Sequence, residues 1–316
     1  VYDGYRQTLT KDLSVAALRR NMAIALCHRA PPYYYALVTG TDFDSPALAE
    51  DVGVIRFTYP ASATSELKID LARRIGERWR AKRFSTQDVR FESDRELVGT
   101  ICCDHRDGGW GRGDGLVDYT LHFRAYCSKP LVDRTATGGN TNLVLHAKFP
   151  TVADEKVELE VRVSFESVPP PFVPRGFDAV RAASRVAWEK AFACLDVEGG
   201  TARERTIFAT ALYHAFLDPR AVEQGDGWTR RTVFSGWDVF RSEFPLLTLL
   251  RPDVVSDTIN SLSDVMRRGD RDTLPVWDIF GCKSSCMIGN PLIPVIADAY
   301  EKGIRTFDAE LVWRQC

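Results

Sequence analysis

The N-terminal half of the chain alternates polar and apolar residues with a period of two. Residues 158–165 (ELEVRVSF) give the clearest case, and residues 54–60, 119–126 and 142–147 carry the same pattern. Such alternation is typical of strands that bury one face and expose the other. Several short strands separated by turns predict an antiparallel β-sandwich over residues 1–168.

A cluster of prolines at residues 169–174 separates this part from the rest of the chain. Because proline removes a backbone donor and interrupts helices and central strands, we interpret residues 169–199 as a linker with a connecting helix. Asp178 is the predicted N-cap of that helix. Its apolar stripe is predicted to run from Val180 to Cys194.

Beyond the linker the apolar period changes to 3.6 residues. This period predicts helices at residues 202–217, 253–268 and 291–302. Asp253 is the expected cap of the second helix, and Gly303 is expected to end the third. The C-terminal part of the chain is therefore predicted to be helical.

Composition narrows the choice of partners. The chain has 316 residues, 45% hydrophobic and 27% charged, as in an ordinary globular protein. A formal net charge of −2 offers no basic excess for phosphate binding, so no nucleic-acid partner is expected. No apolar run approaches the roughly 20 residues that a membrane helix needs, so no membrane partner is expected either. The eight cysteines lack the paired spacing of a zinc site and leave the redox compartment open.

Two tryptophan–carboxylate segments stand about forty residues apart, at 234–241 (FSGWDVFR) and 274–281 (LPVWDIFG). Each places an indole next to a carboxylate, and an arginine and a lysine follow them. An indole suits the apolar face of a sugar ring, and charged groups bind sugar hydroxyls. The candidate site residues are Trp237, Asp238, Arg241, Trp277, Asp278 and Lys283.

The first segment also has a structural interpretation. Aromatic residues usually belong to the core, so Trp237 and Phe240 would be core residues in this alternative. Asp238 and Arg241 would then form an ion pair beneath a loop.

Both segments resemble sequences of glycoside hydrolase family 92, the calcium-dependent exo-α-mannosidases. The similarity is closest at residues 274–303, where LP-x-W, MIG and PVIADAY-x-KG match, and it extends more loosely over about residues 100–316. The resemblance implies that residues 200–316 are the first helices of an (α/α)6 toroid. It also implies exo-hydrolysis of terminal α-mannosides with inversion, on a mannose-containing glycan of the N-glycan or mannan type.

The resemblance carries roles onto matching residues. A Trp-Asp-Thr-(Phe/Tyr)-Arg segment helps to hold the terminal mannose in family 92, and this chain has Val239 in place of the threonine. The match implies that Trp237 stacks on the sugar and that Asp238 and Arg241 bind its hydroxyls. It further implies a Ca²⁺ ion, with most of its ligands outside this chain.

The chain departs from the family at the proton donor. Family members usually read Gly-Asn-Glu-Thr before Met-Ile-Gly, and that glutamate is the expected general acid. Residues 281–284 read GCKS instead, so Lys283 stands in the position of the acid. A lysine with a pKa near its ordinary value of about 10.4 is a weak acid at neutral pH. Asp278 is a possible substitute with a shorter side chain.

Three hypotheses for Lys283 remain open. It is a surface residue of a non-catalytic mannose-binding homologue, or a perturbed residue of a weak mannosidase. Alternatively, it binds the phosphate of a mannosyl phosphodiester, whose leaving group needs no proton. The family's Gly-Asn-Asp-Asp-x-Gly segment, which carries the catalytic base, does not occur in the 316 residues. We therefore interpret the chain as a fragment that lacks the base region and expect it to be inactive alone.

Overall fold

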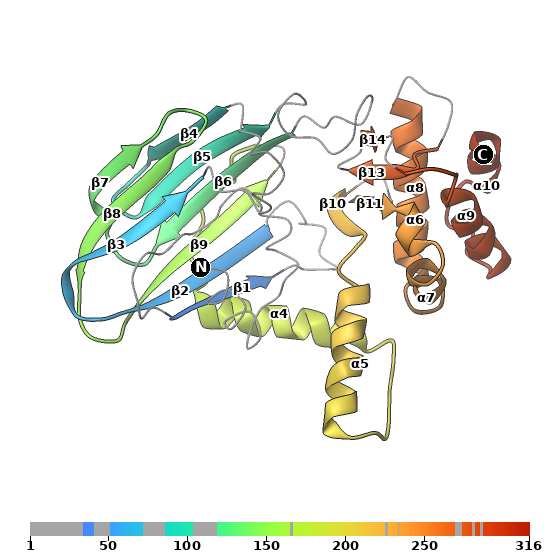
Figure 1. Cartoon of the computed structure of the whole chain (residues 1–316), viewed down its shortest axis with the longest axis horizontal. Helices are drawn as coiled ribbons and strands as arrows, with labels where there is room; N and C mark the ends of the chain where they lie inside the picture. The colour runs from blue at the N-terminus through green and yellow to red at the C-terminus, as the bar shows by residue number, and fades with distance from the viewer. Residues whose placement is uncertain are drawn as a thin grey trace. The chain divides into compact units, whose positions relative to one another are not determined.

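The computed structural model describes residues 34–40, 51–71, 86–103, 119–164, 167–224, 227–232, 234–268, 274–279, 282–284 and 287–316. These residues form two compact units, one that extends to Trp188 and one that comprises Glu189–Cys316. The first is rich in strands and the second is largely helical (Figure 1). The predicted change from strands to helices is therefore confirmed.

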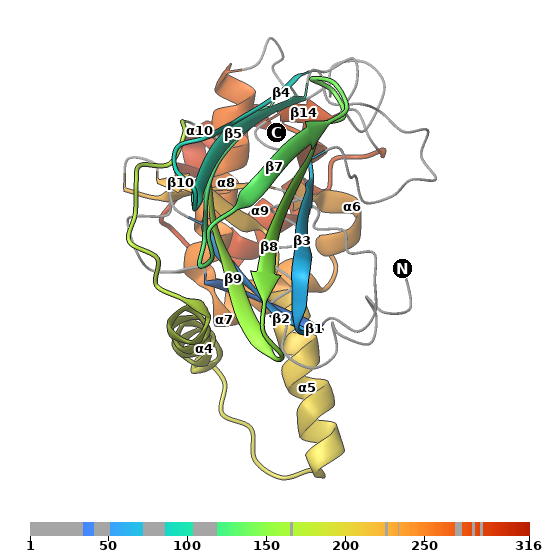
Figure 2. The same cartoon turned by 90° about the vertical axis from the view of Figure 1, so that its left-hand side faces the viewer.

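The N-terminal unit contains two antiparallel sheets (Figures 1 and 2). A six-stranded sheet has the order β1-β2-β9-β6-β5-β4, and a three-stranded sheet has the order β3-β8-β7. The strands are β1 (Tyr34–Gly40), β2 (Asp51–Tyr59), β3 (Ser62–Asp70), β4 (Thr86–Phe91), β5 (Glu96–Cys103), β6 (Tyr119–Cys127), β7 (Val132–Thr137), β8 (Val144–Thr151) and β9 (Glu155–Ser164).

The two sheets share one apolar core. Leu67 of β3 and Phe149 of β8 belong to the same buried cluster as Phe123 of β6 and Leu159 of β9. Within β9 the inward residues Val157, Leu159, Val161 and Val163 alternate along the strand, as the period of two predicts. The alternation of the sequence thus gives this part of the chain its buried face.

Helix α4 (Phe177–Phe192) packs on the opposite face of the six-stranded sheet. Phe177 and Val180 of the helix form a separate buried cluster with Val52 and Val54 of β2. Asp178 lies in the first turn of the helix and does not cap it. The predicted stripe also ends early: the helix stops at Phe192, and Cys194 is an exposed residue of the following turn.

Arg56 of β2 fastens this helix to the sheet. Its guanidinium donates to Glu158 of β9 at 2.8 Å and to Asp178 at 2.6 Å. The same group lies 4.2 Å from the ring centroid of Phe177. One cation therefore joins two strands and a helix through charge and ring contacts together.

The C-terminal unit combines helices with short strands. The predicted helices are confirmed to within two residues as α5 (Ala202–Ala215), α8 (Pro252–Arg268) and α9 (Leu292–Glu301). The period did not predict the remaining elements, which are β10 (Arg220–Gln224), β11 (Thr229–Thr232), β12 (Phe234–Ser235), α6 (Gly236–Val239), α7 (Glu243–Leu250), β13 (Trp277–Ile279), β14 (Cys282–Ser284) and α10 (Ala309–Gln315).

Helix α8 lies against β11, α7 and α9. Val255, Ile259 and Leu262 on its inner side are buried. Asp253 lies in its first turn and is not its cap, because the helix begins at Pro252. Gly303 has φ +89° directly after α9, which confirms the predicted stop. Among the described residues no helix is long and apolar enough to cross a membrane.

Candidate functional site

A three-stranded sheet brings the two tryptophan–carboxylate segments together. Strand β12 pairs with β13, so that Phe234 lies opposite Asp278 and Ser235 lies opposite Trp277. Strand β14 then pairs with β13 and places Lys283 opposite Asp278. Residues that are about forty positions apart in the sequence are thus neighbours in one sheet.

Three candidate residues that follow β12, Trp237, Asp238 and Arg241, are exposed. Trp237 lies in the single turn of α6, and 51% of its surface is accessible. Asp238, also exposed, accepts a hydrogen bond of 2.5 Å from the hydroxyl of Ser235. Arg241 follows in the turn after α6 and is exposed as well. An indole with half of its surface free argues against the core interpretation of Trp237.

Gly236 allows this segment to lie close to the loop that precedes α9. A Cβ atom at this position would stand 2.3 Å from Cγ of Pro291 and 2.7 Å from the ring of Phe234. The ring of Phe234 in turn packs edge-on against Phe244 at 5.4 Å. The contact with Pro291 therefore requires glycine at position 236, and it fixes the position of the backbone that leads into Trp237.

Asp278 is buried below this surface, with none of its area exposed. Its Oδ2 accepts a hydrogen bond of 2.7 Å from the hydroxyl of Thr232, which is also buried. Because a buried carboxylate is costly without such bonds, this contact fixes β13 to the end of β11. The burial favours a structural role for Asp278, and its role as a substitute acid stays a prediction.

Two candidate site residues of this sheet remain, Trp277 and Lys283. Trp277 is partly buried in β13. Lys283 belongs to β14, and its side chain lies outside the described part of the chain.

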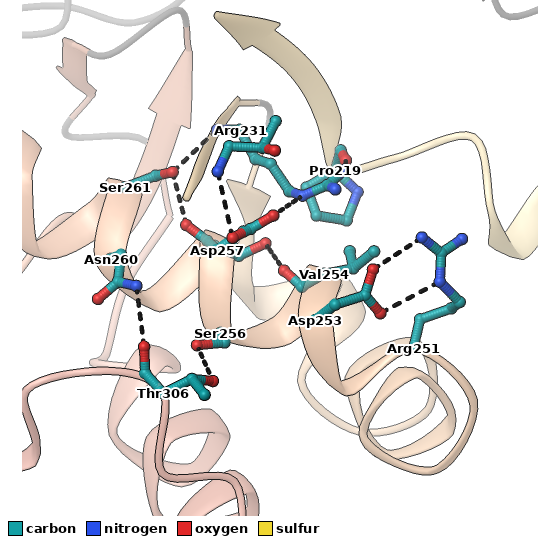
Figure 3. Close-up of polar contacts among 12 residues, drawn as sticks. Pro219, Arg231, Arg251, Asp253, Val254, Ser256, Asp257, Asn260, Ser261 and Thr306 are labelled. Atoms are coloured by element: carbon teal, nitrogen blue, oxygen red, sulfur yellow. Dashed lines mark hydrogen bonds and ion pairs between the residues drawn. The ribbon is translucent and has the colours of Figure 1, made fainter. Parts of the chain in front are cut away.

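Helix α8 contacts β11 through polar groups of Arg231 (Figure 3). The backbone N–H of Arg231 donates to the hydroxyl of Ser261 at 2.8 Å, and its Nε donates to Asp257 at 3.3 Å. Asp257 also accepts from the backbone N–H of Thr229 at 3.2 Å. Burial lowers the pKa of Arg231 and raises the pKa of Asp257, and their mutual attraction opposes both shifts. This brace positions Thr232 beneath Asp278.

Three polar residues at or near the site were not identified from the sequence pattern. Thr232 gave no signal, because a threonine at the end of a strand is common. Ser235 stands three residues before Asp238, a spacing that permits a local side-chain bond. Glu243 begins the apolar helix α7, where burial, with the charge of Asp218 in addition, raises its pKa to about 7. Its burial depends on tertiary packing that the local sequence does not show.

Metal ligands are the next requirement of the family resemblance. Within the described ranges, no three histidine, cysteine, aspartate or glutamate side chains lie close enough together to hold a metal ion. The Ca²⁺ ion that the family resemblance implies stays a prediction.

Comparisons with known proteins agree with these motifs. Residues 171–316 match the family model described as the glycosyl hydrolase family 92 catalytic domain. A solved family GH92 α-mannosidase from Bacteroides thetaiotaomicron is 24% identical, with a TM-score of 0.69 over 84% of this chain and 40% of that one. Its complex with mannoimidazole aligns at 21% identity and a TM-score of 0.69, over 90% of this chain and 45% of that one.

A GH92 inverting mannosidase from Bacteroides thetaiotaomicron VPI-5482 is also similar. It is 22% identical, with a TM-score of 0.66 over 83% of this chain and 37% of that one. No curated protein matches the chain. The chain thus spans less than half the length of these solved mannosidases, and at such identities the likeness establishes the fold.

Proposed function

Residues 171–316 belong to glycoside hydrolase family 92, and from this premise we propose that the chain is part of an exo-acting α-mannosidase. The proposed substrate is a mannose-containing glycan of the N-glycan or mannan type, and the bond is hydrolysed with inversion. The pairing of β12 with β13 supports the proposal, because it gathers both tryptophan segments in one sheet. Solved relatives described as an α-mannosidase with mannoimidazole and as an inverting mannosidase also support it.

The proposed roles follow from exposure and chemistry. Trp237 offers an accessible indole to the apolar face of the terminal mannose. Asp238, oriented by the hydroxyl of Ser235, accepts hydrogen bonds from sugar hydroxyls. Arg241 is exposed in the next turn and donates to them. Trp277 lies partly buried in β13 of the same sheet and contributes a second apolar surface.

The proton donor decides which bond is broken. Cleavage between two sugars expels an alkoxide, which needs a proton as it leaves. We place Lys283 in the position of the family's acid. A lysine in this position favours a second candidate, hydrolysis of a mannosyl phosphodiester. A lysine ammonium is a weak acid at neutral pH, and its positive charge suits a phosphate leaving group, which needs no proton.

Two further elements belong to the proposal for the complete enzyme. Residues 1–168 are the sandwich domain, residues 169–199 are the linker with its helix, and residues 200–316 are the start of the catalytic domain. Helices α5, α7, α8, α9 and α10 in this last part are the first helices of an (α/α)6 toroid. Calcium is held by the complete enzyme, mostly by residues outside this chain. Neither element enters the roles given to Trp237, Asp238 and Arg241.

Mannose release by the full-length protein that contains this chain tests the proposal. The substrates are α-1,2-mannobiose and the methyl diester of mannose 1-phosphate, and proton NMR identifies the first anomer formed. Trp237→Ala is expected to lower kcat/KM about tenfold or more, since a tenfold loss corresponds to only ~1.4 kcal/mol of stacking. Trp313→Ala, at an indole that is 76% exposed on α10, is the control and should retain the rate.

The outcomes separate the candidates. Inverting release from mannobiose supports the mannosidase, and release from the diester alone supports the second candidate. Sugar binding without turnover of either substrate would identify a non-catalytic homologue. Neither binding nor turnover would refute the proposed function.

A further inference from the structure

A groove runs along the first turns of α8. Asp253, Ser256, Asp257 and Asn260 form its floor, at the spacing that puts residues on one face of a helix. The groove has a volume of about 620 Å³. Small-molecule sites commonly have volumes of roughly 300–1,000 Å³. Its size therefore suits one or two sugar rings.

Both walls of the groove are hydrogen-bonded to its floor. On one side, the hydroxyl of Thr306 donates to Ser256 at 2.6 Å, and the amide of Asn260 donates to the carbonyl of Thr306 at 3.3 Å (Figure 3). On the other side, Asp257 accepts from the backbone of Thr229, which follows the wall residue Trp228. Because these bonds hold the walls, a ligand would lose little free energy in ordering the site.

Trp228 supplies the aromatic part of this wall. It is half-buried and lines the groove. The guanidinium of Arg230 lies 5.3 Å from its ring and is paired with Asp264 at 2.5 Å. The indole is thus supported by a charged group that is itself fixed to α8.

Charges around the groove compensate one another. Two carboxylates and two cations, Lys302 and Arg305, line it. Three of the four are in ion pairs, Asp253–Arg251 at 2.8 Å, Asp257–Arg231 at 3.3 Å and Lys302–Asp298 at 2.7 Å. Arg305 donates to the backbone carbonyls of Tyr300 and Ile304 and lies 3.6 Å from the ring centroid of Tyr300. The described lining therefore offers a phosphate or a cation no cluster of unpaired charge, whereas an uncharged polyol meets many donors and acceptors. Paired carboxylates still accept hydrogen bonds, because each has about four acceptor positions.

We propose that this groove binds one pyranoside ring of an uncharged glycan. Trp228 lies against the apolar face of the ring, and Asp253 and Asn260 bind its hydroxyls. The three residues are distinct from those given to hydrolysis. If the chain is part of a mannosidase, the groove holds a second sugar of the same glycan, and this consequence rests on the proposed function. Binding of a sugar in the groove does not depend on that function.

Ligand-observed NMR on the whole 316-residue chain tests this proposal, with methyl α-D-mannopyranoside as the probe. Trp228→Ala and Asn260→Ala are each expected to weaken binding at the groove about tenfold or more, or to remove it. Trp313→Ala is the matched control and should bind as the unaltered chain does. Circular dichroism melting identifies a variant that fails to fold. If Trp228→Ala fails to fold, Asn260→Ala decides the test.

Trp237→Ala distinguishes the two sites. Sugar binding that survives Trp237→Ala and is lost in Trp228→Ala supports the groove, whatever becomes of the proposed hydrolysis. Binding that is lost in Trp237→Ala and unchanged in both groove variants overturns the inference and leaves the proposed function in place. Saturable binding of inorganic phosphate in place of the sugar also overturns it.

Discussion

The raised pKa of Glu243 predicts an unusual dependence of the free energy of unfolding on pH. Burial, with the charge of Asp218 in addition, raises its pKa from 4.5 to about 7. Between these values the folded chain keeps a proton that the unfolded chain releases. The stability that depends on this group is therefore fully present below about pH 4.5 and is lost as the pH rises through about 7. Since one pKa unit is about 1.4 kcal/mol, the loss is at most about 3 kcal/mol.

Glu243→Gln preserves the shape of the side chain and removes its titration. The variant is expected to be more stable than the parent by up to about 3 kcal/mol near pH 8, and equal to it near pH 4.5. Urea unfolding followed by circular dichroism at several pH values measures the difference. Glu198→Gln, in an exposed loop, is the matched control. A difference that stays constant within about 0.5 kcal/mol, or that grows toward low pH, would refute the reasoning.

Three more predictions concern the sheet at the site. Gly236→Ala forces Pro291 to move and is expected to cost about 1–3 kcal/mol in urea unfolding; an unchanged midpoint would contradict the close contact. Thr232→Val removes the donor to buried Asp278 and should cost about 1–3 kcal/mol, whereas Thr232→Ser should restore most of it; equal losses in both variants would exclude the hydrogen bond as the cause. Lys283→Glu in the full-length protein should raise mannobiose turnover by about 10² or more, as general acids do, and no gain would count against Lys283 as the acid's position.

Elements with a clear period were predictable from the sequence. Strand β9 alternates over ten residues, and helices α8 and α9 repeat their apolar positions over several turns. In such elements the apolar residues that form the pattern are the same residues that pack into the core, so the pattern predicts the buried face. Helix limits were less predictable, since Asp178 and Asp253 stand one residue inside the helices that they were expected to cap. An acidic residue is favourable both at the cap and in the first turn, so the sequence does not separate the two.

The site itself was predictable only as a set of residue types. Trp237 and Trp277 were predicted from their chemistry, and those roles stay predictions, but strands of two or three residues have no period to detect. Their pairing depends on long-range contacts, as does the burial of Asp278. The same limit hid the groove on α8, because Trp228 and Thr306 reach it from distant parts of the chain.

The pairing of β12 with β13 has a consequence for the order of folding. Helices α7 and α8 lie between these strands in the sequence, so the strands meet only after the intervening chain has closed into a loop. Closing that loop costs conformational entropy, and the few contacts between the short strands do not offset this cost until the helices have packed. The exposed surface at Trp237 is therefore expected to form late and to be lost with the helical core. Protection of the β13 amides from hydrogen exchange would then report the cooperative unfolding of this unit and not a local opening.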